Sequence, residues 1–266
     1  MGYTLGMLTY PQFSPEVFTI GPVAVRWYGF MYLLGFLTAW LLGRYRAGSA
    51  VFTRAQFDDV LTFGILGVIL GARLGYVFFY QPLYYLDHPL EIVQLWHGGM
   101  SFHGGLIGVM LGQWFAGRRH GKGFFQTMDF MAPLVPPGLF FGRLGNFING
   151  ELWGNVTDAP WGMIFPGGGN LPRHPSQLYE AALEGVALFA IVWIFSAKPR
   201  PRMAVSGVFA LGYGFFRFFV EFFRQPDAHL GYLAFGWLTM GMLLCVPMIL
   251  LGVLLLWLAY RKRNAA

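Results

Sequence analysis

The sequence is organised around residues 142–154, which read GRLGNFINGELWG. This stretch ends an apolar run that is long enough to cross a lipid bilayer, yet it carries an arginine, two asparagines and a glutamate among its glycines. Only 11% of the residues in the chain are charged. Because hydrocarbon penalises charged and amide side chains, their presence at the end of a membrane span indicates a functional site.

Composition places the whole chain in a membrane. Of its 266 residues, 56% are hydrophobic and the mean hydropathy is +0.53, whereas about a quarter of the residues in a soluble domain are charged. We therefore predict an all-α polytopic membrane protein. The single cysteine excludes an internal disulfide framework. The N-terminus lacks the basic region of a cleavable signal peptide, so none is expected.

Seven apolar segments of roughly 20 residues have the length needed to cross about 30 Å of hydrocarbon. The predicted spans cover residues 22–43, 57–80, 98–116, 124–148, 178–197, 203–223 and 234–258. Residues 1–20 are expected to lie at the membrane surface as an N-terminal arm. Residues 149–177 are too long for a simple turn, and we predict that they form a small periplasmic cap.

Glycine and proline add detail to three of these spans. Glycine recurs at every fourth position in the second and third spans, at residues 67, 71 and 75 and at residues 104, 108 and 112. This spacing lets two helices approach closely, and we expect the two glycine faces to pack together beside a central cavity. Prolines at residues 133, 136 and 137 interrupt the fourth span, which predicts a kink.

Basic residues give the chain an orientation. The loops at residues 44–56, 117–123 and 198–202 and the C-terminal end each hold three Lys or Arg, whereas the alternate loops hold almost none. The positive-inside rule therefore places the N-terminus outside and the C-terminus in the cytoplasm. The net charge of +6 is then a topology signal, and it does not indicate a nucleic-acid partner.

This topology gathers polar side chains near the outer leaflet, where alternate helices begin or end. They are Tyr28, His103, Arg143, Asn146, Glu151, Glu180, Glu184, Glu221 and Arg224. Arginine suits a phosphate at headgroup depth, because the guanidinium is permanently charged and forks onto two oxygens. Arginine can also snorkel or pair with an acid, and both interpretations stay open for Arg26 and Arg73.

Spacing assigns different roles to the other arginines. Arg143 and Asn146 share one helix face, and no acid lies within a helical turn of Arg143 in the sequence, which favours a ligand-binding role. Arg217 and Glu221 are four residues apart and fit a structural ion pair. Arg224 lies one turn further outward and is the second candidate for binding a phosphate.

His103 opens the third span beside two glycines. Imidazole is the natural general base near neutral pH, but a lone histidine at a membrane interface is also an ordinary interfacial residue. Position alone leaves both interpretations open. Asp129, beside the predicted kink, is expected to cap freed backbone amides. Cys245 is expected to behave as a small apolar residue in the last span.

Five segments of the chain form longer patterns. They are residues 26–29 (RWYG), 103–108 (HGGLIG), 142–151 (GRLGNFINGE), 174–180 (HPSQLYE) and 221–227 (EFFRQPD). Together they resemble the signature segments of the bacterial prolipoprotein diacylglyceryl transferase family, and the resemblance extends over nearly the whole chain. It implies a multi-pass protein of the bacterial cytoplasmic (inner) membrane with its active site toward the periplasmic leaflet.

The resemblance also implies a reaction. A diacylglyceryl group passes from phosphatidylglycerol to the thiol of the lipobox cysteine in a prolipoprotein signal peptide, a thioether forms, and glycerol phosphate leaves. No cofactor is implied, and the sequence shows no cluster of metal ligands. The positions that matter by this resemblance are Tyr28, His103, Arg143, Asn146, Glu151, Gly154 and Arg224.

The residue chemistry predicts a role for each position in such a reaction. We expect His103 to act as the base, although an arginine or a water molecule is an alternative. Arg143 and Arg224 are expected to bind the phosphate, with Asn146 and Tyr28 orienting the headgroup. The acids Glu151 and Glu221 are expected to position arginines.

A transporter for an anionic lipid or a small anion is the main alternative. Outer arginines and a broken helix would also suit its binding site. Two observations count against it, because the charges gather at one leaflet without a polar path to the other, and no inverted repeat is evident.

Overall fold

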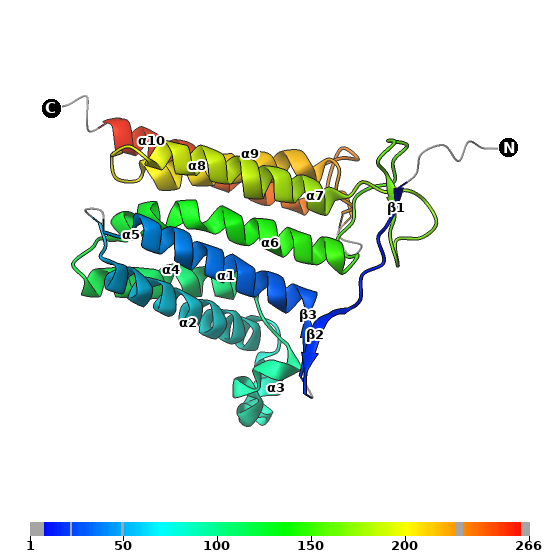
Figure 1. The fold of residues 1–266 in the computed structure, drawn as a ribbon, viewed down its shortest axis with the longest axis horizontal. Coiled ribbons are helices and arrows are strands. Elements are labelled where there is room, and N and C mark those ends of the chain that lie inside the picture. The colour runs from blue at the N-terminus through cyan, green and yellow to red at the C-terminus, as the bar shows by residue number, and fades with distance from the viewer. Residues whose placement is uncertain (1–7, 22, 49–50, 227–230, 262–266) are drawn as a thin grey trace. The chain divides into compact units, whose positions relative to one another are not determined.

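The computed structural model describes residues 8–21, 23–48, 51–226 and 231–261, and the chain is mostly helical (Figure 1). The first residues of the predicted arm, 1–7, lie outside these ranges, as do Asp227 and the basic residues Lys262 and Arg263. Two compact units divide the chain, Met1–Ala39 with Ala132–Ala266 and Trp40–Met131. Helix α1 (Trp27–Arg46) begins in the first unit and ends in the second.

The first unit contains the C-terminal helices. They are η3 (Ala132–Leu134), α6 (Val135–Ile148), α7 (Ser176–Glu180), the π-helical η4 (Ala181–Ala187), α8 (Leu188–Ser196), α9 (Ala204–Glu221) and α10 (Met240–Arg261). Helices α7, η4 and α8 follow one another without a break, and α9 lies beside α10 (Figure 1). Leu188 and Val192 of α8 pack with Ala132 and Val205, and these four buried residues form an apolar core.

The second unit contains the remaining helices. They are α2 (Arg54–Phe79), α3 (Pro82–Asp87), the 3-10 helices η1 (Pro89–Val93) and η2 (Leu95–His97), α4 (Phe102–Arg119) and α5 (Phe124–Met131). Arg73 of α2 is buried, and its guanidinium donates to the carbonyl oxygens of Glu91, Ile92, Gly98 and Gly99. Arg73 thus organises the turns between α3 and α4, which resolves its open interpretation in favour of a structural role.

Four helical stretches among the described residues are long and apolar enough to cross a membrane. They are Arg54–Phe79, Ser176–Ser196, Ala204–Glu221 and Met240–Arg261. Helices α1 and α4 have 20 and 18 residues, but both contain polar or charged side chains as well as glycines and tryptophan, and they are less apolar than these four stretches. The chain is a membrane protein, and its arrangement in seven spans stays a prediction.

The N-terminal segment corrects the expectation of an all-α chain. Strand β2 (Glu16–Ile20) pairs with β3 (Val23–Arg26) in an antiparallel ladder, and β1 (Leu8–Thr9) pairs in parallel with β4 (Met163–Ile164). The first helix therefore begins at Trp27 and not near residue 22. Valine, isoleucine and threonine flank Gly21, whose φ is +58°, and β-branched residues on both sides of a turn favour a hairpin.

The last helix also begins later than predicted. Residues 234–239 were expected to be helical, but Ala234 and Leu238 form a β-bridge around Phe235 and Gly236, both of which have positive φ. The Thr239 hydroxyl then accepts a hydrogen bond from the Met242 N–H, at 3.2 Å. This contact caps the first turn of α10, as threonine does at many helix N-termini.

Prolines break the helix where the sequence predicts. Helix α5 ends at Met131, η3 forms a 3-10 turn, and α6 begins at Val135. Pro136 and Pro137 fall in the first turn of α6, where an N–H group has no acceptor within the helix and proline costs little. The predicted interruption is confirmed.

Helices α2 and α4 lie side by side (Figure 1), and they pack through their glycines. A Cβ added at Gly75 would lie 2.8 Å from the Cα of Gly104, and one added at Gly71 would lie 2.8 Å from the Cα of Gly108. No real side chain fits at such a distance, so the two backbones touch directly. The close approach predicted from the glycine spacing is confirmed.

Gly108→Ala should therefore destabilise the second unit. The new methyl would lie 2.9 Å from the Cα of Gly71 and closer still to the Gly67 carbonyl oxygen, and overpacking of this kind costs roughly 1–3 kcal/mol. We expect a lower midpoint of thermal unfolding in detergent. Gly105→Ala is the matched control, because its methyl would meet the Cβ of Ala72 at an ordinary 3.4 Å. Equal midpoints for the two variants would contradict this packing.

Candidate functional site

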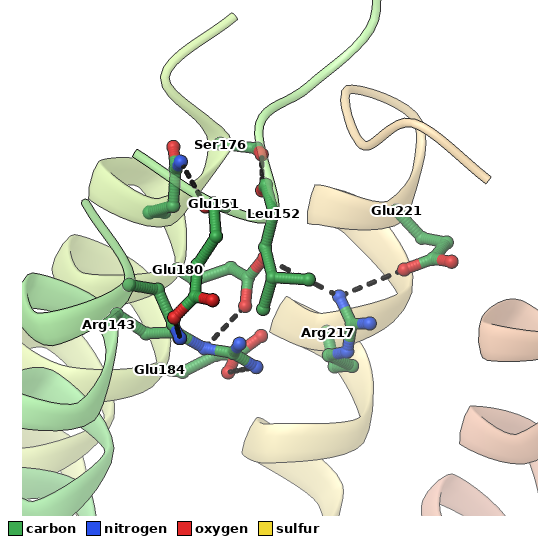
Figure 2. Close-up of polar contacts among 10 residues, drawn as sticks. Arg143, Glu151, Leu152, Ser176, Glu180, Glu184, Arg217 and Glu221 are labelled. Carbon is green, nitrogen blue, oxygen red and sulfur yellow. Dashed lines mark hydrogen bonds and ion pairs between the residues drawn. The ribbon is translucent and has the colours of Figure 1, made fainter. Parts of the chain in front are cut away.

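Charged side chains from four helical segments meet inside the first unit (Figure 2). The Nε of Arg143 lies 2.5 Å from Oε2 of Glu180, and its Nη2 lies 3.7 Å from Oε2 of Glu184. The Nη1 of Arg217 lies 2.9 Å from Oε2 of Glu221 and 3.9 Å from Oε1 of Glu180. Glu180 therefore bridges two arginines, and we call these residues the charge network.

The charge network is buried. The side chains of Glu180 and Glu184 are 0% exposed, and those of Arg143 and Arg217 are 18% and 13% exposed. Buried charges persist only when opposite charges lie close by. The Oε1 atom of Glu184 makes no hydrogen bond to a described residue. The charge network holds three acids and two arginines, and Arg224 also interacts electrostatically with Glu184.

The sequence-based interpretation of Arg143 needs correction. It relied on the absence of an acid within a turn of the same helix, but the fold brings Glu180 and Glu184 from a different helical segment. Arg143 is thus an ion-paired arginine. Its Nη1 group makes no hydrogen bond or ion pair with another described residue. The structural ion pair predicted for Arg217 and Glu221 is confirmed, and the Thr239 hydroxyl donates to the second oxygen of Glu221 at 2.9 Å.

Local packing explains how two acids on one helix reach Arg143. Segment η4 is π-helical, a form that occurs mostly as short insertions at functional sites, and it contains Glu184 and Gly185. A Cβ at Gly185 would lie 2.6 Å from the Cβ of Phe140 on α6. Only glycine permits this approach, which places Glu180 and Glu184 against the helix that carries Arg143.

Glu151, in the loop after α6, is held by several hydrogen bonds. Glu151 accepts hydrogen bonds from the side-chain amides of Asn146, at 2.9 Å, and Asn149, at 3.2 Å. The side chain of Gln177 donates to the Glu151 carbonyl at 2.6 Å. The expectation that Glu151 positions an arginine is wrong for the described residues, since its partners are asparagines.

Gly154 is packed between the backbone of His174 and that of the segment Phe223–Arg224. Its N–H donates to the carbonyl of His174 at 2.8 Å, and it forms a β-bridge with Arg224. A Cβ at this position would lie 2.7 Å from the Cβ of His174 and closer still to the Phe223 carbonyl oxygen. The absence of a side chain at Gly154 thus lets its backbone pair with the segment that carries Arg224.

Arg173 adds further hydrogen bonds between these segments. Its guanidinium donates to the carbonyl oxygens of Gly168, at 2.7 Å, and Gly154, at 3.2 Å, and to Oε1 of Gln225, at 2.8 Å. The neighbouring His174 ring lies 3.0 Å from the Tyr179 hydroxyl, and burial lowers the pKa of His174. Residues 154, 173 and 225 are therefore joined in one hydrogen-bonded unit.

Tyr28 stands at the start of α1, next to α6. A Cβ at Gly145 would lie 3.1 Å from the Tyr28 ring, and the Tyr28 hydroxyl lies 3.2 Å from that of Tyr32. Its side chain is 38% exposed, and Gly145 directly precedes Asn146. The structure thus places the Tyr28 ring against α6 at Gly145.

His103 belongs to the second unit. It lies in the first turn of α4, is exposed, and contacts the Phe102 ring edge-on at 5.6 Å between centroids. The Ser101 hydroxyl caps this turn by accepting from the Gly104 N–H. The assignment of His103 as a base stays a prediction.

Sequence reasoning gave no role to Glu180, Glu184 or Arg173. Two glutamates one turn apart in an apolar span were the available signal, because acids inside a span are rare without a function. Arg173 gave no comparable signal, since an arginine in a polar loop is ordinary. Among the described residues, no three His, Cys, Asp or Glu side chains lie together as a metal site would require.

Comparison with known proteins gives matches along almost the entire chain. A family model described as prolipoprotein diacylglyceryl transferase matches residues 15–258. The phosphatidylglycerol–prolipoprotein diacylglyceryl transferase of Oleidesulfovibrio alaskensis is 64% identical over 263 residues, 98% of each chain. The protein of that name from Nitratidesulfovibrio vulgaris strain DP4 is 61% identical over 94% of this chain and 96% of its own. That from Pseudomonas aeruginosa strain LESB58 is 60% identical over 97% and 98%.

Proposed function

Because the chain belongs to the prolipoprotein diacylglyceryl transferase family, we propose that it transfers the diacylglyceryl group of phosphatidylglycerol to the lipobox cysteine of prolipoproteins. This is the first step of lipoprotein maturation. The main support is the 64% identity over 98% of each chain to a relative whose name states the lipid and the acceptor.

The proposed reaction is a displacement at carbon. The thiolate of the acceptor attacks the glycerol carbon that bears the phosphate ester, a C–S bond forms, and the C–O bond breaks. The electron pair leaves with glycerol phosphate, and the thiol proton passes through a base to the released phosphate. A thiol is a poor nucleophile until it is deprotonated. The sulfur comes from the substrate, since Cys245 is buried in α10.

Arg143 and Arg224 are the proposed phosphate ligands. The acid partners of Arg143 lie at Nε and Nη2 and not at Nη1, and the backbone of Gly154 pairs with that of Arg224. Both would stabilise the charge that develops on the leaving phosphate. Asn146 and Tyr28 would orient the headgroup, with Glu151 fixing the Asn146 amide.

We place the site at the periplasmic leaflet of the bacterial inner membrane. The proposed arrangement has seven spans with the N-terminus outside, the cap at residues 149–177, and openings between helices through which lipid and signal peptide enter. The three-residue basic clusters support this orientation. The donor is a lipid and the acceptor is a membrane-bound peptide, so both reach the site from the bilayer.

A transfer assay tests the proposal. Purified protein is incubated with phosphatidylglycerol and a lipobox peptide, and the peptide mass should increase by one diacylglyceryl group as glycerol phosphate is released. A peptide with serine in place of the lipobox cysteine is the control and should stay unmodified. Spheroplasts that contain the protein should modify a peptide supplied from outside. An unchanged peptide mass would contradict the transferase and favour the transporter.

His103 is the proposed base, because its imidazole can take the thiol proton near neutral pH. In the same assay, His103→Gln should lower the rate by about 10²–10⁴-fold, the range that a positioned acid or base contributes. Retention of most of the activity would place the base elsewhere.

A further inference from the structure

We propose that Glu180 is a positioning residue for the transfer reaction. It orients the Arg143 guanidinium toward the lipid phosphate and ties that guanidinium to Arg217. The inference rests on the proposed function, and it concerns a residue that itself has no contact with the reacting atoms. The charge network supplies the geometry (Figure 2).

Glu180 selects which edge of the Arg143 guanidinium faces outward. The Oε2 atom of Glu180 lies 2.5 Å from the Nε of Arg143, and the Oε2 atom of Glu184 lies 3.7 Å from the Nη2 of Arg143. Because Glu180 lies at Nε and Glu184 lies near Nη2, Nη1 is the guanidinium nitrogen that is left for another ligand, and the 3.7 Å contact at Nη2 is longer than a hydrogen bond. A phosphate bound at Nη1, with Nη2 beside it, would use the fork that matches two phosphate oxygens.

Both carboxylate oxygens of Glu180 form ion pairs with arginines. They are buried and make no hydrogen bond to a described residue, so ion pairing with Arg143 and Arg217 accounts for the contacts of the carboxylate. A buried ion pair is weak evidence for stability, because desolvation cancels much of the attraction. A fully buried acid between two arginines therefore suits a role in their orientation.

The helix that carries Glu180 is fixed at both ends of the contact. Before it, the Ser176 hydroxyl donates to the Leu152 carbonyl at 3.1 Å, and Gln177 donates to the Glu151 carbonyl. After it, Gly185 packs directly against Phe140, on the helix that carries Arg143. Glu180 is therefore held relative to Arg143 from two sides, and this meets the requirement for a group that orients another.

The test is a double-mutant cycle on lipid binding and turnover. Glu180→Gln keeps the size of the side chain and removes its charge, and Arg143→Lys keeps a charge and removes the fork. The Kd of the purified protein for a short-chain phosphatidylglycerol is measured by titration, and kcat and KM are measured in the transfer assay. Residues in one salt-bridge network are energetically coupled. We therefore expect Glu180→Gln to raise Kd and KM roughly tenfold.

Coupling distinguishes positioning from structural support. If Glu180 acts through Arg143, the double variant should bind lipid within about twofold of Arg143→Lys alone, whereas independent effects would multiply. A Kd for Glu180→Gln that equals the wild-type Kd, or multiplicative losses in the double variant, would overturn the proposal. Absence of transfer by the wild type would instead reject the proposed function, and the two failures are thus distinguishable.

Glu180→Asp covers the case in which Glu180→Gln does not fold. Aspartate keeps the charge but is one methylene shorter, so the pairing with Arg143 is stretched while the buried site keeps its acid. We expect Glu180→Asp to unfold near the wild-type temperature with a raised Kd and to show the same coupling to Arg143→Lys. A wild-type Kd for this variant would also overturn the proposal.

Discussion

Replacing Arg143 by alanine should abolish diacylglyceryl transfer. The change removes a proposed ligand of the departing phosphate, and loss of one such charge-stabilising donor typically lowers the rate by about 10²–10³-fold. It also leaves Glu180 and Glu184 buried without their shared partner, and breaking a buried pair in this way costs about 3–5 kcal/mol of stability. Loss of activity and loss of stability are thus expected together in Arg143→Ala.

Arg143→Lys separates the two effects. Lysine can keep a positive charge beside Glu180, so its thermal unfolding midpoint should stay near that of the wild type. It lacks the planar fork, and we expect kcat/KM for phosphatidylglycerol to fall by roughly 10²-fold. Arg200→Ala is the control, because Arg200 is exposed at the end of α8, and its activity should change by less than about threefold. Wild-type turnover of Arg143→Lys would remove Arg143 from phosphate binding.

Gly154→Ala should have a comparable effect through the backbone. The added methyl would lie 2.7 Å from the Cβ of His174 and 2.8 Å from the His174 carbonyl oxygen. The opposite neighbour is the carbonyl of Phe223, which is also backbone and cannot rotate aside. The backbone around Gly154 must then separate from the segment that holds Arg224, and a displacement of about 1 Å in a catalytic group can lower the rate by about 10²-fold.

Measurement of kcat/KM for Gly154→Ala and Arg224→Ala checks this explanation. If Gly154 acts by placing Arg224, the two variants should lose activity to a similar extent, by roughly 10²-fold. Gly138→Ala is the glycine control, since a Cβ at Gly138 would have no atom within 4 Å, and it should keep wild-type activity. Full activity of Gly154→Ala would show that the close contact around this glycine is unimportant for transfer.

Much of the fold follows from local patterns. The prolines at 136 and 137 start α6 because proline suits a first helical turn. The glycines at 71 and 108 meet because a fourfold spacing leaves one helix face without side chains. Strand β3 was missed because the first predicted span, residues 22–43, takes in its residues, and β2 because residues 1–20 were predicted only as a surface arm.

In the candidate site, some contacts follow from the local sequence and others depend on the tertiary fold. Asn146, Glu151 and Gly154 lie within a few residues of one another, so their contacts follow from the loop that connects them. The partners of Arg143 come from another helix, and no periodicity in the sequence indicates which acid will face which arginine. Arg224 depends on Gly154 and on Arg173 for its surroundings, through hydrogen bonds between distant segments.

By itself, the sequence determined that this protein lies in a membrane, where its helices break and touch, and which polar residues need a reason to be there. These properties depend on hydropathy, glycine and proline, which act over a few residues. Only the tertiary structure decided that Glu180 bridges Arg143 and Arg217, and that a glycine supports Arg224. Ion pairs and backbone contacts form only over a few ångströms, and the number of residues between two positions in the sequence does not reveal how close they lie in space.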